Sequence, residues 1–327
     1  MYRVLVLVLA AVGIVGVACG GGDESAEDQR LHVVTTVSPI TSIADAIGGE
    51  RINLDGVVPE GVNSHTYEPA PSVARTVSSA DLIIVNGLEL EAPLLRLAEV
   101  NKPDDAVILL LGDQTVTPEQ WIFDFSFPAT DGRPNPHLWT DPILGLRYAE
   151  LIEAELARLD PDNAAFYATN LAAFRTRIEA LDAAIIEAVA TVPEGQRKLV
   201  TYHDSWPYFS LRYGFEVLGA VQPSDFSDPS PRELASLIDQ VKAAGVPAVF
   251  GSEVFPSDVL ETIAEESGAT FVADLRDDDL PGEPGDPEHS YLGMMVANME
   301  SMIPALGGSA EAFADLDLGP ALGSGVR

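Results

Sequence analysis

The stretch DNAAFYATNLAAFRTRIEALDAAIIEAVATVP, residues 162–193, decides how the 327-residue chain is organised. Its distribution of apolar residues predicts one amphipathic helix. Asp162 is the expected N-cap and Pro193 the expected stop. A helix of about 28 residues spans about 42 Å at 1.5 Å per residue. This length is unusual inside a single globular domain, and it favours a rigid strut between two lobes.

Both flanks of this helix alternate between strands and helices. Apolar runs without polar alternation, such as 81–87 and 106–112 before the helix, are typical of strands buried in a parallel sheet. After the helix, 198–203 is a further predicted strand. Helical stretches separate these runs, which predicts βαβ units. We therefore predict an α/β fold with two lobes, each with a central, mostly parallel sheet, joined by the long rigid helix.

The sequence predicts six segments along the chain. The first lobe ends before the long helix, and the second begins at Pro193. We expect the residues after 308 to be weakly ordered. The predicted segments are a signal peptide (1–18), a flexible tether (19–30), an N-terminal lobe (31–160), a linker helix (161–192), a C-terminal lobe (193–310) and a tail (311–327).

The N-terminus has the pattern of a secretory signal. Arg3 is its one cation, and an apolar run continues to Cys19. Because Cys19 is the only cysteine, the chain has no intrachain disulfide. A cysteine after GVA resembles a bacterial lipobox, although Gly16 stands where leucine is commoner. We predict lipidation at Cys19 and an anchored protein outside the cytoplasmic membrane; the alternative is an ordinary signal peptide with an incidental cysteine.

The chain carries a net charge of −33, from 51 acidic and 18 basic residues. Such a polyanion is repelled by nucleic acid and by anionic lipid, so we expect no nucleic-acid partner. Its natural small partners are cations, although excess acid also serves solubility alone. We interpret the acidic stretch 277–288 as a solvated, charged loop.

Three of the five histidines flank the ends of predicted elements. His65 follows a strand, His137 precedes a helix, and His203 ends a strand, while Asp274 ends another strand. Ligands of open parallel sheets bind at the carboxyl ends of strands. Two of these four residues fall in each lobe, which is consistent with a four-ligand metal site in the cleft between them; the alternative for each histidine is an ordinary hydrogen-bonded polar residue. Three nitrogens and one oxygen suit zinc, with manganese or iron as alternatives.

Several motifs together resemble one family. The chain is similar to the metal-binding solute receptors of ABC importers, cluster A-I, which deliver zinc or manganese. The resemblance implies that the metal is held by His65, His137, His203 and Asp274, and that the partner is an ABC permease. The motifs are HTYEP (65–69), ADLIIVNGLELE (80–91), NPHLWTDP (135–142), YHDSWPYFSLRYGF (202–215), DPSPRELASLIDQVKAAGVPAVFGSEVF (228–255) and FVADL (271–275).

Two departures from the family pattern bear on the site. Residues 113–136 contain no histidine, so a metal-gathering loop is not predicted. NPH replaces the commoner DPH, which removes a carboxylate beside His137. Asp141, Asp204 and Glu253 are candidates to orient the imidazoles through hydrogen bonds, with helix capping or surface ion pairs as the alternative for each.

The sequence favours a monomeric binding protein that hands a divalent cation, Zn²⁺ or alternatively Mn²⁺, to a permease. A zinc hydrolase keeps three protein ligands and an open position for water. Four protein ligands fill that position, and the chain lacks HExxH and GxSxG motifs. An adhesin or interaction lipoprotein is the third class, and no motif supports it directly.

Overall fold

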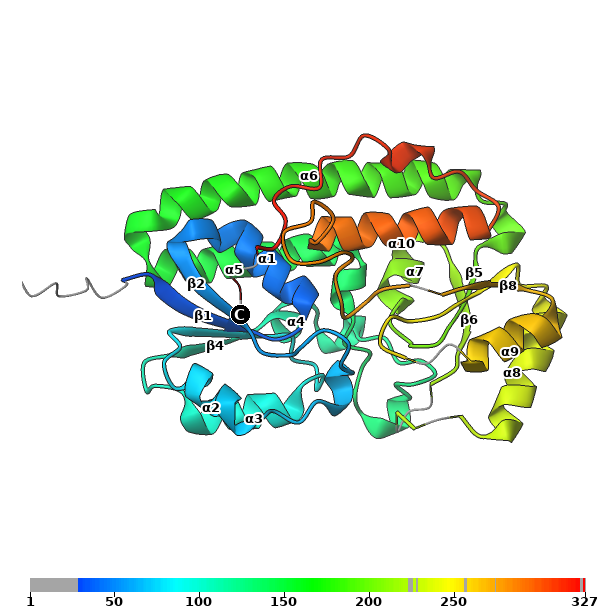
Figure 1. Cartoon of the computed structure of the whole chain (residues 1–327), viewed down its shortest axis with the longest axis horizontal. Helices are drawn as coiled ribbons and strands as arrows, with labels where there is room; N and C mark the ends of the chain where they lie inside the picture. The colour runs from blue at the N-terminus through cyan, green and yellow to red at the C-terminus, as the bar shows by residue number, and fades with distance from the viewer. Residues whose placement is uncertain are drawn as a thin grey trace, which may run out of the picture.

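The computed structural model describes residues 29–222, 226–227, 229–255, 258–273, 275–323 and 326. Two four-stranded parallel sheets form two lobes that lie end to end (Figure 1). The strand order is β2-β1-β3-β4 in the first sheet and β6-β5-β7-β8 in the second. The two lobes therefore repeat one topology, as the sequence predicted.

The N-terminal sheet is built from short apolar strands, and all four residues of β3 are buried. Its strands are β1 (Leu31–Thr35), β2 (Ile52–Gly56), β3 (Leu82–Val85) and β4 (Val107–Leu110). The helices of this lobe are α1 (Ser38–Gly48), α2 (Pro71–Val77), α3 (Ala92–Asn101) and α4 (Leu111–Thr115).

The C-terminal sheet repeats this plan. Its strands are β5 (Lys198–Thr201), β6 (Glu216–Ala220), β7 (Ala248–Phe250) and β8 (Thr270–Val272). The helices are α7 (Pro207–Tyr213), α8 (Pro231–Ala244), α9 (Asp258–Ser267) and α10 (Tyr291–Ala305). Helix α8 begins with a capping box between Ser230 and Glu233 and ends at Gly245 in the left-handed conformation.

One long helix runs along both lobes, and the helix before it packs against α1 and α4 of the N-terminal lobe. Helix α5 (Pro142–Leu159) begins with Asp141, whose side chain accepts a hydrogen bond from the Ile143 amide. Helix α6 (Ala164–Thr191) has 28 residues and runs along both lobes (Figure 1). The predicted strut is confirmed, although Asn163 rather than Asp162 occupies its N-cap position.

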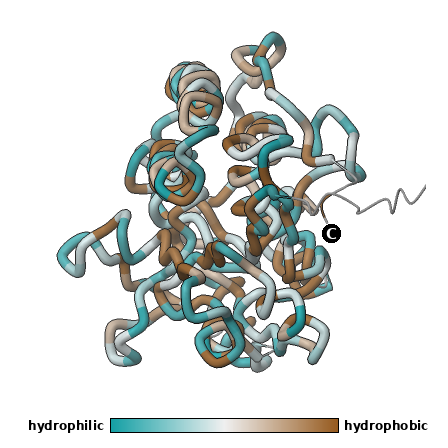
Figure 2. The backbone as a smooth tube through the Cα atoms, turned by 90° about the vertical axis from the view of Figure 1, so that its left-hand side faces the viewer, coloured by the Kyte–Doolittle hydropathy of each residue, from teal (hydrophilic) through white to brown (hydrophobic). Residues whose placement is uncertain are grey.

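One hydrophobic core passes from the first lobe through α6 into the second. It contains Val33 of β1, Ile178 of α6 and Phe250 of β7, all fully buried. In the view along the long axis, hydrophobic segments concentrate toward the middle of the molecule (Figure 2). A shared close-packed core resists shearing, so we expect small relative movements of the lobes.

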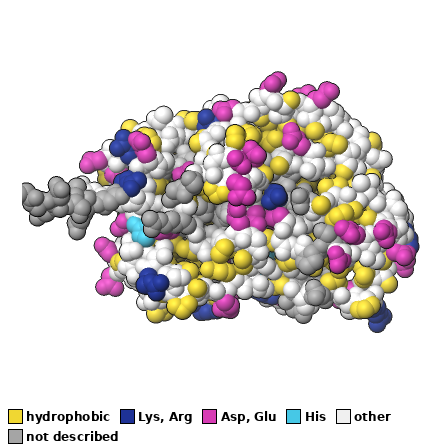
Figure 3. Space-filling model, in the orientation of Figure 1, with side chains coloured by type: hydrophobic (Ala, Val, Ile, Leu, Met, Phe, Trp, Pro, Cys, Tyr) yellow, Lys and Arg dark blue, Asp and Glu magenta, His cyan; other side chains and the backbone are white. Residues whose placement is uncertain are grey.

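Two sequence expectations are wrong. The tail is packed rather than weakly ordered over its described residues: Phe313 and Leu322 are buried, and Asp317 forms a 2.7 Å ion pair with Arg177 of α6. The acidic stretch is not wholly solvated either, because its first three aspartates, Asp277 to Asp279, are buried. Other acidic side chains gather where this loop crosses between the lobes (Figure 3).

The signal and tether residues 1–28, Cys19 included, lie outside the described residues. Within the described residues, no helix combines the length and the apolar character needed to cross a membrane.

Candidate metal centre

Three histidines from distant parts of the chain meet at the boundary between the lobes. His65 lies in a 3₁₀ turn (Ser64–Thr66) after β2, His137 directly precedes another (Leu138–Thr140), and His203 follows β5. Their Nε2 atoms lie 3.1 Å (His65–His137), 3.2 Å (His65–His203) and 2.9 Å (His137–His203) apart. Among the described residues, these three form the one group arranged to hold a metal ion.

The triangle of Nε2 atoms has the size of one face of a metal tetrahedron. Zn–N bonds of about 2.05 Å in tetrahedral geometry place ligand nitrogens about 3.3 Å apart. The three distances in this site, 2.9 to 3.2 Å, are slightly shorter. A cation just above the plane of the triangle would contact all three nitrogens, and a fourth ligand would complete the tetrahedron.

The proton positions on two rings follow from their other hydrogen bonds. His137 Nδ1 lies 2.7 Å from Asn135 Oδ1, and His203 Nδ1 lies 2.5 Å from Gln222 Oε1. An amide oxygen only accepts, so each Nδ1 must donate and carry a proton. In the neutral rings Nε2 then holds a lone pair. Two lone pairs face each other at 2.9 Å, which is repulsive unless a cation lies between them.

The amide of Asn135 is fixed in this orientation. Its Nδ2 donates to the Asp124 carboxylate at 3.0 Å and to the backbone carbonyl of Asp204 at 2.6 Å. Both partners are acceptors here, so Oδ1 must be the atom that faces His137. Burial, with the adjacent charge of Asp204, raises the pKa of Asp124, and the two carboxyls hold a proton between them at neutral pH.

The electrostatic environment favours neutral rings. Burial lowers the pKa of both His65 and His137 well below the usual value, and the neighbouring His203 ring lowers each further. A neutral imidazole is the form that binds metal. The rings are therefore ready to coordinate at neutral pH without losing a proton first.

Carboxylates line the C-terminal side of the cluster. Asp277 Oδ2 lies 3.4 Å from His203 Nε2, and the Ser205 side chain also interacts with this carboxyl. Among the described residues, neither oxygen of Asp277 has a partner in good hydrogen-bond geometry. Asp278 accepts a 3.3 Å hydrogen bond from the Ser64 amide through Oδ2, while its buried Oδ1 also lacks a partner there. Buried acceptors without donors are costly unless a cation satisfies them.

Asp274, the acid expected from the resemblance, lies outside the described residues. Asp277 and Asp278 were not predicted as site residues, because their stretch has the composition of a solvated loop. Their position five and six residues after the end of β8 was the available signal. Gln222 was also missed, although it follows the carboxyl end of β6 by two residues, where ligand-binding groups gather in parallel sheets.

The three acids proposed to orient imidazoles make other contacts. Asp141 caps α5 and lies 3.7 Å from Arg212. The Asp204 carboxylate accepts from the Ser126 amide, so Asp204 reaches His137 only through its carbonyl and Asn135. Glu253 accepts from the backbone amides of Asp277, Asp278 and Asp279. Side-chain amides, rather than these three carboxylates, are the Nδ1 partners of His137 and His203.

Aromatic side chains shield the cluster from solvent. Phe226 stacks on His65 with ring centroids 4.5 Å apart, and Phe255 stacks on His203 at 5.4 Å. Trp139 packs edge-on against His137 and donates from Nε1 to the Asp277 carbonyl at 2.7 Å. This hydrogen bond joins the segment of one N-terminal ligand to the acidic loop of the C-terminal lobe.

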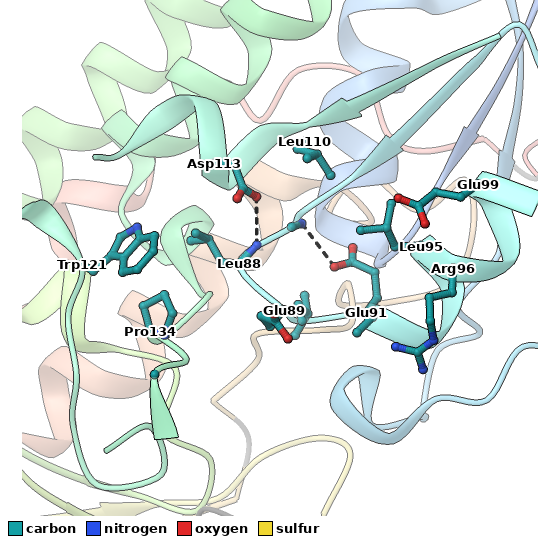
Figure 4. Close-up of a pocket in the computed structure, with 14 residues that line it drawn as sticks. Leu88, Glu89, Glu91, Leu95, Arg96, Glu99, Leu110, Asp113, Trp121 and Pro134 are labelled. Carbon is teal, nitrogen blue, oxygen red and sulfur yellow. Dashed lines mark hydrogen bonds between the residues drawn. The ribbon is translucent and has the colours of Figure 1, made fainter. Parts of the chain in front are cut away.

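A narrow crevice leads to His65, and a larger pocket of about 340 Å³ adjoins it. Both are lined by Leu88, Glu89, Leu90 and Pro134, in the turn after β3 and in the segment before His137. Figure 4 shows Asp113 accepting from the Leu88 amide, which fixes this turn. The adjoining Asn86 donates to the Pro136 carbonyl at 3.0 Å, so the turn also positions the segment that carries His137.

Comparisons with known proteins agree with this geometry. The model of the family described as zinc-uptake complex component A, periplasmic, matches residues 33–305. The manganese-binding lipoprotein MntA of Halalkalibacterium halodurans is 31% identical over 301 residues, 91% of this chain and 97% of that protein. The iron ABC transporter substrate-binding lipoprotein MtsA of Streptococcus pyogenes serotype M1 is 29% identical over 300 residues, 89% of this chain and 94% of that protein.

A solved structure shares the two-lobed fold. The periplasmic zinc binding protein TroA from Treponema pallidum superposes with a TM-score of 0.76 at 25% identity, covering 85% of this chain and 99% of that one. The family match spans both lobes and includes all three clustered histidines. The chain therefore belongs to the zinc-uptake complex component A family, the metal-binding substrate receptors of ABC importers.

Proposed function

We propose that this protein captures one divalent transition-metal ion, Zn²⁺ in preference to Mn²⁺, outside the cytoplasmic membrane and delivers it to an ABC permease. The observation that carries the proposal is the triangle of Nε2 atoms from His65, His137 and His203. Their lone pairs converge on one point, and the partners of Nδ1 hold two of them there. The metal is cargo, so it must bind reversibly.

The preference for zinc rests on the third nitrogen. Imidazole suits zinc, whereas carboxylate and other oxygen ligands suit the harder manganese. His203 supplies this nitrogen from the C-terminal lobe. One relative is named for manganese and another for iron, so Mn²⁺ is the alternative cargo.

We propose that the fourth ligand is a carboxylate of the Asp277–Asp278 pair rather than Asp274. The unpartnered oxygens of Asp277 and Asp278 and the 3.4 Å approach of Asp277 to His203 support this choice. A site with four protein ligands leaves no position for a reactive water, which favours capture over hydrolysis.

A lipid anchor at Cys19 would keep the protein beside its permease. The relatives named as lipoproteins and the lipobox-like GVAC sequence support this assignment. Diacyl anchoring holds a protein at a membrane without a spanning helix.

Zinc titration in competition with a coloured chelator tests the proposed site. The wild type should bind one zinc per chain, and either Asp277→Asn or Asp278→Asn should lower affinity by roughly tenfold or more. Asp274→Asn should bind as the wild type does. A wild type without stoichiometric zinc binding would overturn the function. A loss confined to Asp274→Asn would overturn the assignment of the fourth ligand.

A further inference from the structure

The acidic loop at the metal site, Asp277 to Asp279, surrounds the carboxylate of a fourth acidic residue, Glu253. Glu253, which follows β7, accepts through one oxygen, Oε1, from three consecutive backbone amides. The donors are Asp277 at 3.1 Å, Asp278 at 3.0 Å and Asp279 at 3.0 Å. Successive amides that converge in this way form an anion-binding nest. Here the carboxylate of Glu253, a residue of the same chain, occupies the nest.

This contact gives three backbone amides an acceptor, but it also has an electrostatic cost. It places a carboxylate among three aspartates, and like charges at short range repel. An apolar or neutral residue would avoid that repulsion. The arrangement makes sense if the position of the loop matters more than its electrostatic cost, since charge-assisted hydrogen bonds are the stronger and more directional ones.

Three further hydrogen bonds of Asp277 to Asp279 come from the N-terminal lobe. Trp139 Nε1 donates to the Asp277 carbonyl, the Ser64 amide donates to Asp278, and the Gly61 amide donates to Asp279 at 2.6 Å. Each of these hydrogen bonds crosses between the lobes. Glu253 instead anchors the loop to the same lobe that carries His203.

We propose that Glu253 is a positioning residue that fixes the carboxylate ligand of the Asp277–Asp278 pair relative to His203. It never touches the metal; it holds the backbone from which the ligand extends. The C-terminal lobe supplies one imidazole, from His203, and one carboxylate, from the Asp277–Asp278 pair. The relative position of these two ligands is then maintained even when contacts between the lobes change. This inference rests on the proposed function.

A double-mutant cycle tests the proposal on the full chain. Glu253→Ala should weaken zinc binding by roughly 10- to 100-fold, the range for residues that orient metal ligands. Glu253→Gln, which keeps an accepting oxygen, should lose less. In an Asp277→Asn or Asp278→Asn background, whichever removes the ligand, Glu253→Ala should cost about threefold or less, because residues acting through one another are not additive. Glu261→Gln, an exposed glutamate on α9, is the matched control and should bind normally.

The outcomes separate this inference from the proposed function. If the wild type binds no zinc, the function fails. If the wild type binds zinc while Glu253→Ala retains full affinity, only the positioning role fails. Equal losses from Glu253→Ala with and without the ligand aspartate would also overturn it, because a purely structural residue acts independently of that carboxylate. Should Glu253→Ala not fold, judged by the melting curve of the metal-free protein, the cycle is run with Glu253→Gln and the same criteria.

Discussion

His137 Nε2 lies 2.9 Å from His203 Nε2, although the two rings belong to different lobes. Amide oxygens accept hydrogen bonds from Nδ1 of both rings, so when the two rings are neutral the facing nitrogens carry lone pairs. The contact is unfavourable without a cation and favourable with one. Metal binding should therefore stabilise the junction between the lobes directly.

Removing one ring should remove most of the affinity. His137→Ala and His65→Ala should each lower zinc affinity by at least about tenfold and reduce the metal-induced rise in melting temperature, since stabilisation follows RT ln(1 + [L]/Kd). Calorimetric titration and thermal melts with and without zinc measure both effects. His32→Ala is a suitable control, because His32 pairs with Asp55 away from the site. Normal zinc binding by both site variants would contradict the assignment.

Replacing His203 should change the choice of metal. His203→Glu exchanges a nitrogen ligand for an oxygen ligand, which should weaken zinc relative to manganese. Competition titrations with the two ions give the affinity ratio for wild type and variant. An unchanged ratio would show that His203 does not coordinate the metal.

Zinc affinity should fall as the pH falls. Burial lowers the pKa of His65 and His137, so these rings stay neutral below the ordinary imidazole value of about 6.5. Burial raises the pKa of Asp277 and Asp278, so protons compete with the metal there as well. Protonation of the histidines and protonation of the aspartates both weaken metal binding in acid. Titrations from pH 8 to pH 5 should show a steady loss with the histidine midpoint below about 6.5; affinity independent of pH would rule out these ligands.

For the metal-free protein, the same groups act on stability with opposite signs. The two histidines have depressed folded pKa values, so they lower the free energy of unfolding as the pH drops below about 6.5. The aspartates have raised folded pKa values, so their unfavourable contribution fades as the pH falls through the folded pKa toward the ordinary Asp value of about 3.9. Metal titration is therefore the cleaner readout of the pH dependence.

Asn135 should contribute to the free energy of unfolding through the hydrogen bonds that its side chain donates. Asn135→Asp removes the donor to Asp124 and to the Asp204 carbonyl and adds a third carboxyl beside them. Leaving such buried acceptors unsatisfied should cost about 1–3 kcal/mol of unfolding free energy. Denaturant melts of the metal-free protein measure this, with the exposed Asn101→Asp as control. Equal stability of wild type and Asn135→Asp would contradict the hydrogen-bond network.

Cys19 should carry the lipid anchor. Cys19→Ala should move the protein from the membrane fraction to the soluble extracytoplasmic fraction, because the acyl chains supply the membrane affinity. Fractionation followed by immunoblotting distinguishes the two forms. A variant that stays with the membrane would exclude lipidation at this cysteine.

The long helix and the strand–helix alternation were predictable because they depend on local periodicity. Helix α6 lies within the predicted 162–193 stretch, and the buried run 82–85 is indeed a central strand. His203 was predictable for a related reason, because it lies just beyond a parallel strand, where ligand-binding residues converge. His65 and His137 joined it through the family motifs HTYEP and NPHLWTDP.

The partners of the rings and the acidic ligand loop depend on long-range contacts. Nothing local shows that Asp277 is covered by Trp139, 138 positions earlier in the chain, or that Glu253 collects the amides of 277–279. A run of three aspartates next to glycine and proline has the composition of a solvated loop. Only tertiary contacts bury it.

Anomalous diffraction from crystals of zinc-loaded protein, recorded on both sides of the zinc absorption edge, tests the central claim most directly. We predict a single strong peak per chain, bonded to the Nε2 atoms of His65, His137 and His203 at about 2.0–2.1 Å and to one oxygen of Asp277 or Asp278. A zinc peak elsewhere, or one that contacts fewer than two of these imidazoles, would contradict the account.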